Sequence, residues 1–159
     1  MKSTGTALFA LGICLVGCRS MPMEDFSSLQ AASKPLLASA CLASAEVAVD
    51  SISNPHVPNL VDRIETRTCG GLSVKTYVST AAADPGGLTM SLQVTRPNHL
   101  LPRYMDIGQS VAPLVTKLGE PSSRTDDSMV YSAPESEDSV TFGIAGDRVV
   151  SIRWDWPVD

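Results

Sequence analysis

The alternation of apolar and polar residues is clearest between Leu88 and Thr95. The apolar members of this stretch are Leu88, Met90, Leu92 and Val94. Since side chains alternate between the two faces of a strand, the pattern predicts a strand with one buried and one solvated face. Two further strands are predicted over Leu60–Thr68 and Leu72–Ser79, joined by a turn at Gly70-Gly71. The connections are too short for crossover helices, so antiparallel pairing is expected.

A helical period follows near the middle of the chain. Ser110 is a good N-cap, and the apolar residues after it are spaced as on one face of a helix. These residues are Val111, Leu114, Val115 and Leu118. Gly119 is expected in the left-handed region just after the helix end, and Pro121 prevents continuation.

The last part of the chain returns to the strand period. Strands are predicted near Ser128–Ser132, Ser139–Ile144 and Arg148–Trp156, with a tight turn at Gly146-Asp147. Two apolar rows are expected to meet in the core. They comprise Val140, Phe142 and Ile144 in one strand and Val150, Ile152, Trp154 and Trp156 in the other.

The segment from Asp25 to Ile52 is rich in Ala, Ser and Leu, which favours helix. Pro35 is costly inside a helix, so we predict a short helix before it and a second from about Ser33 to Ala45. The residues Glu46–Ile52 fit either a helix or a strand. Together the elements predict an α+β fold, with short helices packed on an antiparallel sheet. The two main helix starts suggest a degenerate tandem of two α-β-β-β units, over residues 25–100 and 101–159.

The N-terminus has the layout of a secretory signal. Lys2 provides a positive charge, and residues 7–16 form an uncharged apolar segment. Ten residues are too few to span a bilayer as a helix, which needs roughly 20. Leu15-Val16-Gly17-Cys18 then resembles the lipobox of bacterial lipoproteins. The other interpretations are an ordinary signal peptide, although no A-x-A-like cleavage site is present, and a buried core helix.

The lipobox resemblance implies that residues 1–17 are removed and that Cys18 carries the acyl chains. Residues 18–24 would be the lipidated tether, and the membrane would be contacted through the acyl chains. Such chains contribute about 0.8 kcal/mol for each buried methylene, so several together anchor firmly. Arg19 in the second mature position implies, by the same resemblance, sorting to the outer membrane with the domain facing the periplasm.

Net charge and cysteine content limit the possible partners and the compartment of the protein. The 159-residue chain has a formal net charge of −5, which argues against nucleic acid as a partner. Cys41 and Cys69 remain after Cys14 leaves with the signal and Cys18 is lipidated. A disulfide between them is the favoured interpretation in an oxidising compartment. The alternatives are a metal pair, which lacks the usual ligand spacing, or buried free thiols.

The stretches Ile107-Gly108-Gln109-Ser110 and Leu118-Gly119-Glu120-Pro121 resemble the small outer-membrane lipoproteins of the SmpA/OmlA type, which include BamE. The same helix-then-sheet unit occurs in the β-lactamase-inhibitor-protein fold. The resemblance covers residues 105–156 and implies a BamE-like C-terminal unit. Pro113 and the N-terminal half, residues 24–100, depart from the pattern of that family.

No residue set indicates an enzyme, a cofactor site or a metal site. His56 and His99 are single and lie beside prolines, and no nucleophile elbow or phosphate-binding loop is present. The chain is therefore expected to bind a protein partner rather than catalyse a reaction.

Candidate partner-binding residues are Tyr131, Arg153, Asp155 and Trp156, since aromatic residues and Arg are enriched where interfaces are strongest. Trp154 is expected in the core. Residues 120–138 hold six acidic side chains and one basic one, which fits either a solvated loop or a surface for a basic partner. The favoured function is a non-enzymatic interaction module supporting envelope assembly or integrity. The alternative is an inhibitor or immunity lipoprotein that blocks a secreted enzyme, such as a lysozyme or an effector hydrolase.

Overall fold

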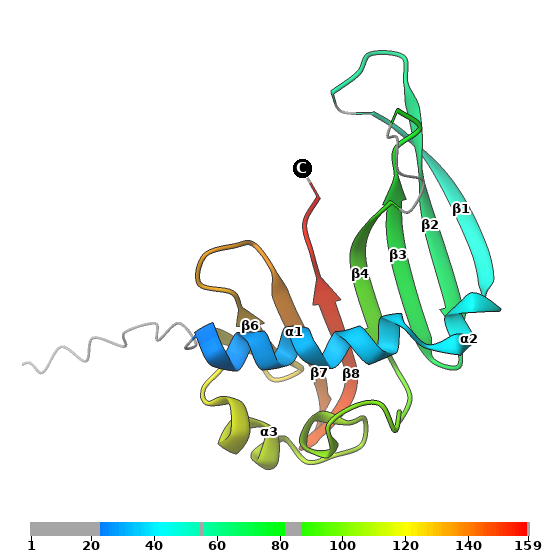
Figure 1. Cartoon of the computed structure of the whole chain (residues 1–159). Coiled ribbons are helices and arrows are strands. Elements are labelled where there is room, and N and C mark those ends of the chain that lie inside the picture. The colour runs from blue at the N-terminus through cyan, green and yellow to red at the C-terminus, as the bar shows by residue number, and fades with distance from the viewer. Residues whose placement is uncertain (1–22, 55, 82–86, 159) are drawn as a thin grey trace, which may run out of the picture.

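A computed structural model describes residues 23–54, 56–81 and 87–158. This part of the chain is an α+β fold in which short helices pack on one open antiparallel sheet of eight strands (Figure 1). The helices are α1 (Met23–Leu37), α2 (Ala40–Ala43) and α3 (Val111–Leu118), with a 3-10 turn η1 (Arg103–Met105). The strands are β1 (Glu46–Ser53), β2 (Val61–Cys69), β3 (Leu72–Val78), β4 (Leu88–Val94), β5 (Ser123–Arg124), β6 (Ser128–Ser132), β7 (Ser139–Ala145) and β8 (Arg148–Asp155). The predicted fold class is confirmed.

Both halves of the chain belong to this sheet. The strand order is β1-β2-β3-β4-β8-β7-β6-β5, so each half forms an antiparallel meander and the last strands of the two meanders pair. Each half has four strands rather than the predicted three. The ambiguous Glu46–Ile52 segment is strand β1, and the two-residue β5 was not predicted. The predicted signal peptide, residues 1–17, and Cys18 lie outside the described residues. The predicted tether is too long by two residues, since α1 begins at Met23.

Helix α1 is continuous where two helices were predicted. Pro35 lies inside it, two residues before its end at Leu37. The apolar stripe explains this, because Phe26, Leu29 and Leu36 all turn toward the sheet and are buried. Pro35 itself is exposed, so its ring points to solvent and only one backbone hydrogen bond is lost. Packing of the stripe therefore outweighs the local preference of the proline. No helix in the described part of the chain is long and apolar enough to cross a membrane.

The core lies between the helices and one face of the sheet. Trp154 is fully buried on β8, and its indole Nε1 donates to the backbone oxygen of Leu29 at 2.9 Å. Helix α1 crosses strands from both halves in this layer (Figure 1). The other large, fully buried side chains are Tyr131, Phe142, Leu29, Leu36, Leu92, Met105, Leu114, Met129 and Ile152. Helix α1 thus holds the two meanders together over a shared core.

The predicted apolar row of the last strand is partly wrong. Ile152 and Trp154 face the core as expected, but Val150 is exposed and Val149 is buried instead. The cause is a bulge in the pairing of β7 with β8, where the register shifts between Gly143 and Ile144. Val150 is the extra residue in β8, so the alternation between the two faces is reversed before it, and Val149 faces the core in place of Val150.

Gly119 ends α3, but not in the expected conformation. Its φ of 79° is positive, whereas its ψ of −169° lies far from the left-handed helical region. This combination is essentially confined to glycine. The backbone N–H still donates to the oxygen of Val115, at 2.8 Å. Ser110 caps the other end of the helix, as predicted, by accepting from the N–H of Ala112.

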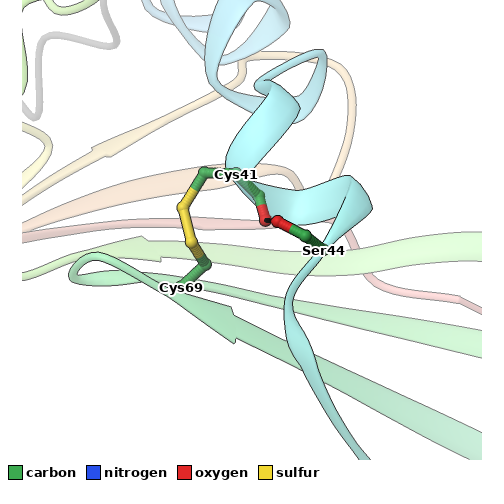
Figure 2. The surroundings of a disulfide bond; sticks show 3 residues. All are labelled: Cys41, Ser44 and Cys69. Carbon is green, nitrogen blue, oxygen red and sulfur yellow. Dashed lines mark hydrogen bonds between the residues drawn. A yellow bond between two sulfur atoms is a disulfide. The ribbon is translucent and has the colours of Figure 1, made fainter.

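The predicted disulfide is present between Cys41 and Cys69. It joins α2 to the last residue of β2, with 5.9 Å between the two Cα atoms (Figure 2). Ser44, one turn along, donates from its hydroxyl to the backbone oxygen of Cys41 at 3.3 Å. The bridge therefore attaches the helical segment to the first meander.

Candidate partner-binding surface

The sheet has a second face, away from the helices, which we call the open face. Cross-strand register places two polar rows on it. The first row is Thr66, Lys75, Ser91, Asp155 and Ser139, and the second is Thr68, Ser73, Gln93, Arg153 and Thr141. Small hydroxyl side chains are frequent in these rows, and the charged residues on the open face include Lys75, Arg153 and Asp155 as well as Glu46 and Asp50 of β1. Such a face can accept and donate hydrogen bonds without a large cost of ordering long side chains.

Arg153 and Asp155 lie together on this face, as neighbours on the same side of β8. The Arg153 Nε lies 2.8 Å from both carboxylate oxygens of Asp155, and a terminal guanidinium nitrogen lies 2.7 Å from one of them. The hydrogen bond that Arg153 donates to Asp155 raises the pKa of Arg153. Both side chains remain partly exposed, at 49% and 31% of their surface. The pair therefore presents a guanidinium donor and a carboxylate acceptor to solvent, and each holds the other in place.

A hollow of about 250 Å³ opens beside this pair. Its remaining lining is Ile64, Lys75, Met90, Ser91, Trp156 and Pro157. Three of the four candidate residues, Arg153, Asp155 and Trp156, thus come together in one place. The sequence did not indicate Lys75 or Met90, because their proximity depends on the β3–β4–β8 pairing between distant segments.

Trp156 has a structural contact as well. Its indole Nε1 donates to the side-chain oxygen of Gln30 at 2.8 Å, and its backbone N–H donates to the oxygen of Met90 at 2.8 Å. Gln30 in turn donates to Asp138 at 3.1 Å. Trp156 is half-buried, so it supports the end of β8 against α1 and offers only one edge to the hollow.

Tyr131 is not a partner-binding residue. The alternation of β6 turns Met129 and Tyr131 into the core, where Tyr131 is fully buried. Its ring meets Phe142 edge-on, with 5.8 Å between the centroids, and its hydroxyl donates to the backbone oxygen of Gly119 at 3.1 Å. Burial, together with the charge of Glu120, raises its pKa to about 12. The sequence did not indicate this burial, because alternation alone does not determine which face of β6 is covered.

The acidic segment does not form one surface. Asp126 and Asp127 lie before β6, and Glu135, Glu137 and Asp138 follow it. A five-residue strand separates the two groups by roughly 17 Å. Asp127 accepts from the hydroxyl of Thr125 at 2.6 Å, so part of this charge is used within its own turn. The carboxylates therefore form two groups, one at each end of β6.

Comparison with known proteins adds no assignment, since no family, no curated protein and no solved structure matches this chain.

Proposed function

We propose that this chain is a non-enzymatic, lipid-anchored interaction module on the periplasmic side of the outer membrane, supporting envelope assembly or integrity. The observation that carries the proposal is the open face, with its hollow beside Arg153 and Asp155. The helices use the other face for the core, so the open face is available to a partner. A partner protein would dock there while the acyl chains on Cys18 hold the module at the membrane.

The chemistry of the hollow indicates what it would recognise. The charge of Arg153 is already balanced by Asp155, whereas Lys75 on the rim is exposed and forms no ion pair within the described part of the chain. Ile64 and Met90 provide an apolar lining. The hollow therefore fits an apolar side chain next to a carboxylate. This local positive charge contrasts with the acidic chain as a whole, so it also orients an approaching acidic partner.

Two other features support export and anchoring. A disulfide forms and persists in oxidising compartments, which is consistent with a periplasmic location. The lipobox-like Leu15-Val16-Gly17-Cys18 supports attachment to a membrane through lipid. The alternative, an inhibitor or immunity lipoprotein, would instead bind a basic enzyme through the acidic residues at the two ends of β6.

A photo-cross-linking residue at Lys75 tests the proposal in intact cells. The matched control is Lys117, an equally exposed lysine on α3, away from the open face. We expect an adduct with an envelope protein from position 75 and none from position 117, and Lys75→Glu should weaken capture of the same partner. Absence of any adduct from position 75 would remove the basis of the proposal. An adduct with a secreted hydrolase would favour the inhibitor alternative.

A further inference from the structure

The two edges of the sheet differ in how they are protected. At one edge, β5 has only two residues and follows closely after Pro121. At the other edge, β1 has eight residues and is exposed along its whole length (Figure 1). It contains no proline, no lysine and no bulge in its register with β2. Proline, lysine and bulges commonly prevent an edge strand from pairing with another chain, so the only such protection within β1 is the charge of Glu46 and Asp50.

Exposed apolar side chains gather at the same edge. Val49 is 57% exposed and Val47 is 44% exposed, both on the side of β1 that continues the helix-covered face. Val61, on the neighbouring strand, is 54% exposed. Most of the large exposed apolar residues in the described part of the chain belong to this β1–β2 hairpin. The edge thus offers apolar contacts beside an unpaired backbone.

The hydrogen-bond pattern identifies which backbone groups are free. Asn54 N–H donates to the oxygen of Leu60 at 2.9 Å, so this opposed pair is a hydrogen-bonded one. Such pairs alternate along an antiparallel ladder. Residues 46, 48, 50 and 52 therefore bond to β2, and Val47, Val49, Ser51 and Ser53 direct their N–H and C=O groups outward.

We propose that β1 pairs with β1 of a second copy of this chain, antiparallel and centred on Val49. In this register Val49 lies opposite its own counterpart, Val47 lies opposite Ser51, and Ala48 lies opposite Asp50. The outward backbone groups of both strands meet, and four valines gather about the two-fold axis. Centring one residue earlier would put Glu46 opposite Asp50, and centring one residue later would put Asp50 opposite itself. Like charges directly opposite are unfavourable, so the Val49 register is favoured over both of these neighbours, and it also pairs more of β1 than a register centred further along the strand.

The inference does not depend on what binds the open face. Pairing at the edge extends the sheet in its own plane and leaves the hollow beside Arg153 accessible. A second copy fits this edge because the symmetric register matches the outward N–H and C=O groups of Val47, Val49 and Ser51 in both strands and places no like charges directly opposite each other. Attachment of both copies to one membrane, if the lipid anchor holds, would raise their local concentration further.

Thiol cross-linking of the full chain in membranes tests this register. Val49→Cys places two thiols across the two-fold axis, with Cα atoms about 5.5 Å apart, within the reach of a disulfide or a short cross-linker. Ser51→Cys is the matched control, because it is equally exposed but lies about 14 Å from its counterpart. We expect a covalent dimer from Val49→Cys alone, and none from the unaltered chain. Equal cross-linking of both variants would overturn the register, and an adduct with a different protein would overturn the second copy as occupant.

Val49→Pro supplies an independent measurement. The N–H of Val49 points outward, so proline removes an intermolecular donor without removing a β1–β2 hydrogen bond. Sedimentation of the detergent-purified chain should show a dimer dissociation constant raised at least about tenfold. An intact Cys41–Cys69 bridge and an unchanged circular dichroism spectrum confirm folding. An unchanged dimer in Val49→Pro, or a monomeric unaltered chain at every concentration, would contradict the proposal.

Discussion

Gly119 gives the sharpest test of the backbone geometry. Its φ of 79° and ψ of −169° belong to a region that side chains with a Cβ avoid at a cost of about 1–3 kcal/mol. An added Cβ would meet no atom within 4 Å, so the cost comes from the backbone alone. The peptide cannot relax easily, because its N–H is bonded to Val115 and its oxygen accepts from Tyr131. Loss of glycine entropy in the unfolded chain offsets about 0.4–1 kcal/mol.

We therefore expect both Gly119→Ala and Gly119→Asn to lower the free energy of unfolding by about 1–2 kcal/mol. This differs from the expectation for a left-handed cap, where Asn is tolerated far better than other residues. In a domain of this size the loss corresponds to roughly 3–5 °C in Tm for each kcal/mol. Thermal unfolding followed by circular dichroism is sufficient to measure it.

Gly70 is the matched control. It lies with Gly71 in the two-residue turn between β2 and β3, and both have positive φ, at 57° and 89°. Asn-Gly is the favoured pair in such a turn, and a Cβ at Gly70 would make only an ordinary 3.5 Å contact with the Cys41 sulfur. Gly70→Asn should thus be nearly neutral. Equal Tm values for Gly70→Asn and Gly119→Asn would show that the described conformation of Gly119 is wrong.

Three further predictions concern the anchor, the bridge and acid stability. Cys18→Ala should abolish labelling by an acyl probe, and label retained on that variant would exclude the anchor. Replacing Cys41, Cys69 or both should lower the free energy of unfolding by the same amount, because each change opens the same bridge. For a loop of about 29 residues the loss is up to about 3.5 kcal/mol, which chemical denaturation would measure. Additive losses would contradict a shared bridge. Hydrogen bonds from Tyr77, Thr80 and Asn54 lower the pKa of Asp62 to about 2. The charged carboxylate therefore stabilises the folded state fully above its unfolded pKa of about 4, and this contribution is lost as the pH falls through about 2. Asp62→Asn should flatten the dependence of stability on pH in that window, and an unchanged slope would mean that another carboxylate is responsible.

Local sequence patterns predicted most of the elements because their signals are local. The strand Ser128–Ser132 has the predicted bounds, and α3 follows the Ser110 cap as expected. Two errors came from effects that a local pattern does not contain. The bulge between Gly143 and Ile144 depends on pairing with β8, and Pro35 is tolerated because packing of the α1 stripe outweighs its cost.

The candidate site was predictable only in part, for a related reason. Alternation placed Arg153 and Asp155 on the side of β8 opposite Trp154, which was already expected in the core. The same reasoning would have buried Tyr131, had the covered face of β6 been known. The contribution of Lys75 required the strand order, since β3 and β8 are brought together only through β4. Long-range order of this kind is not encoded in any single segment.

The indole contact between Trp154 and Leu29 spans 125 residues of chain. Helix α1 can therefore complete its packing only after β8 has been synthesised. Trp154 and the buried residues of α1 belong to one core cluster, so a chain cut before β8 would leave part of that cluster without its cover. Closing a loop of this length carries an entropic cost before any contact compensates for it, and folds with many such contacts form slowly. The protein should thus remain incompletely folded until its C-terminus is free, a delay that would be compatible with the export proposed above, which requires an unfolded chain.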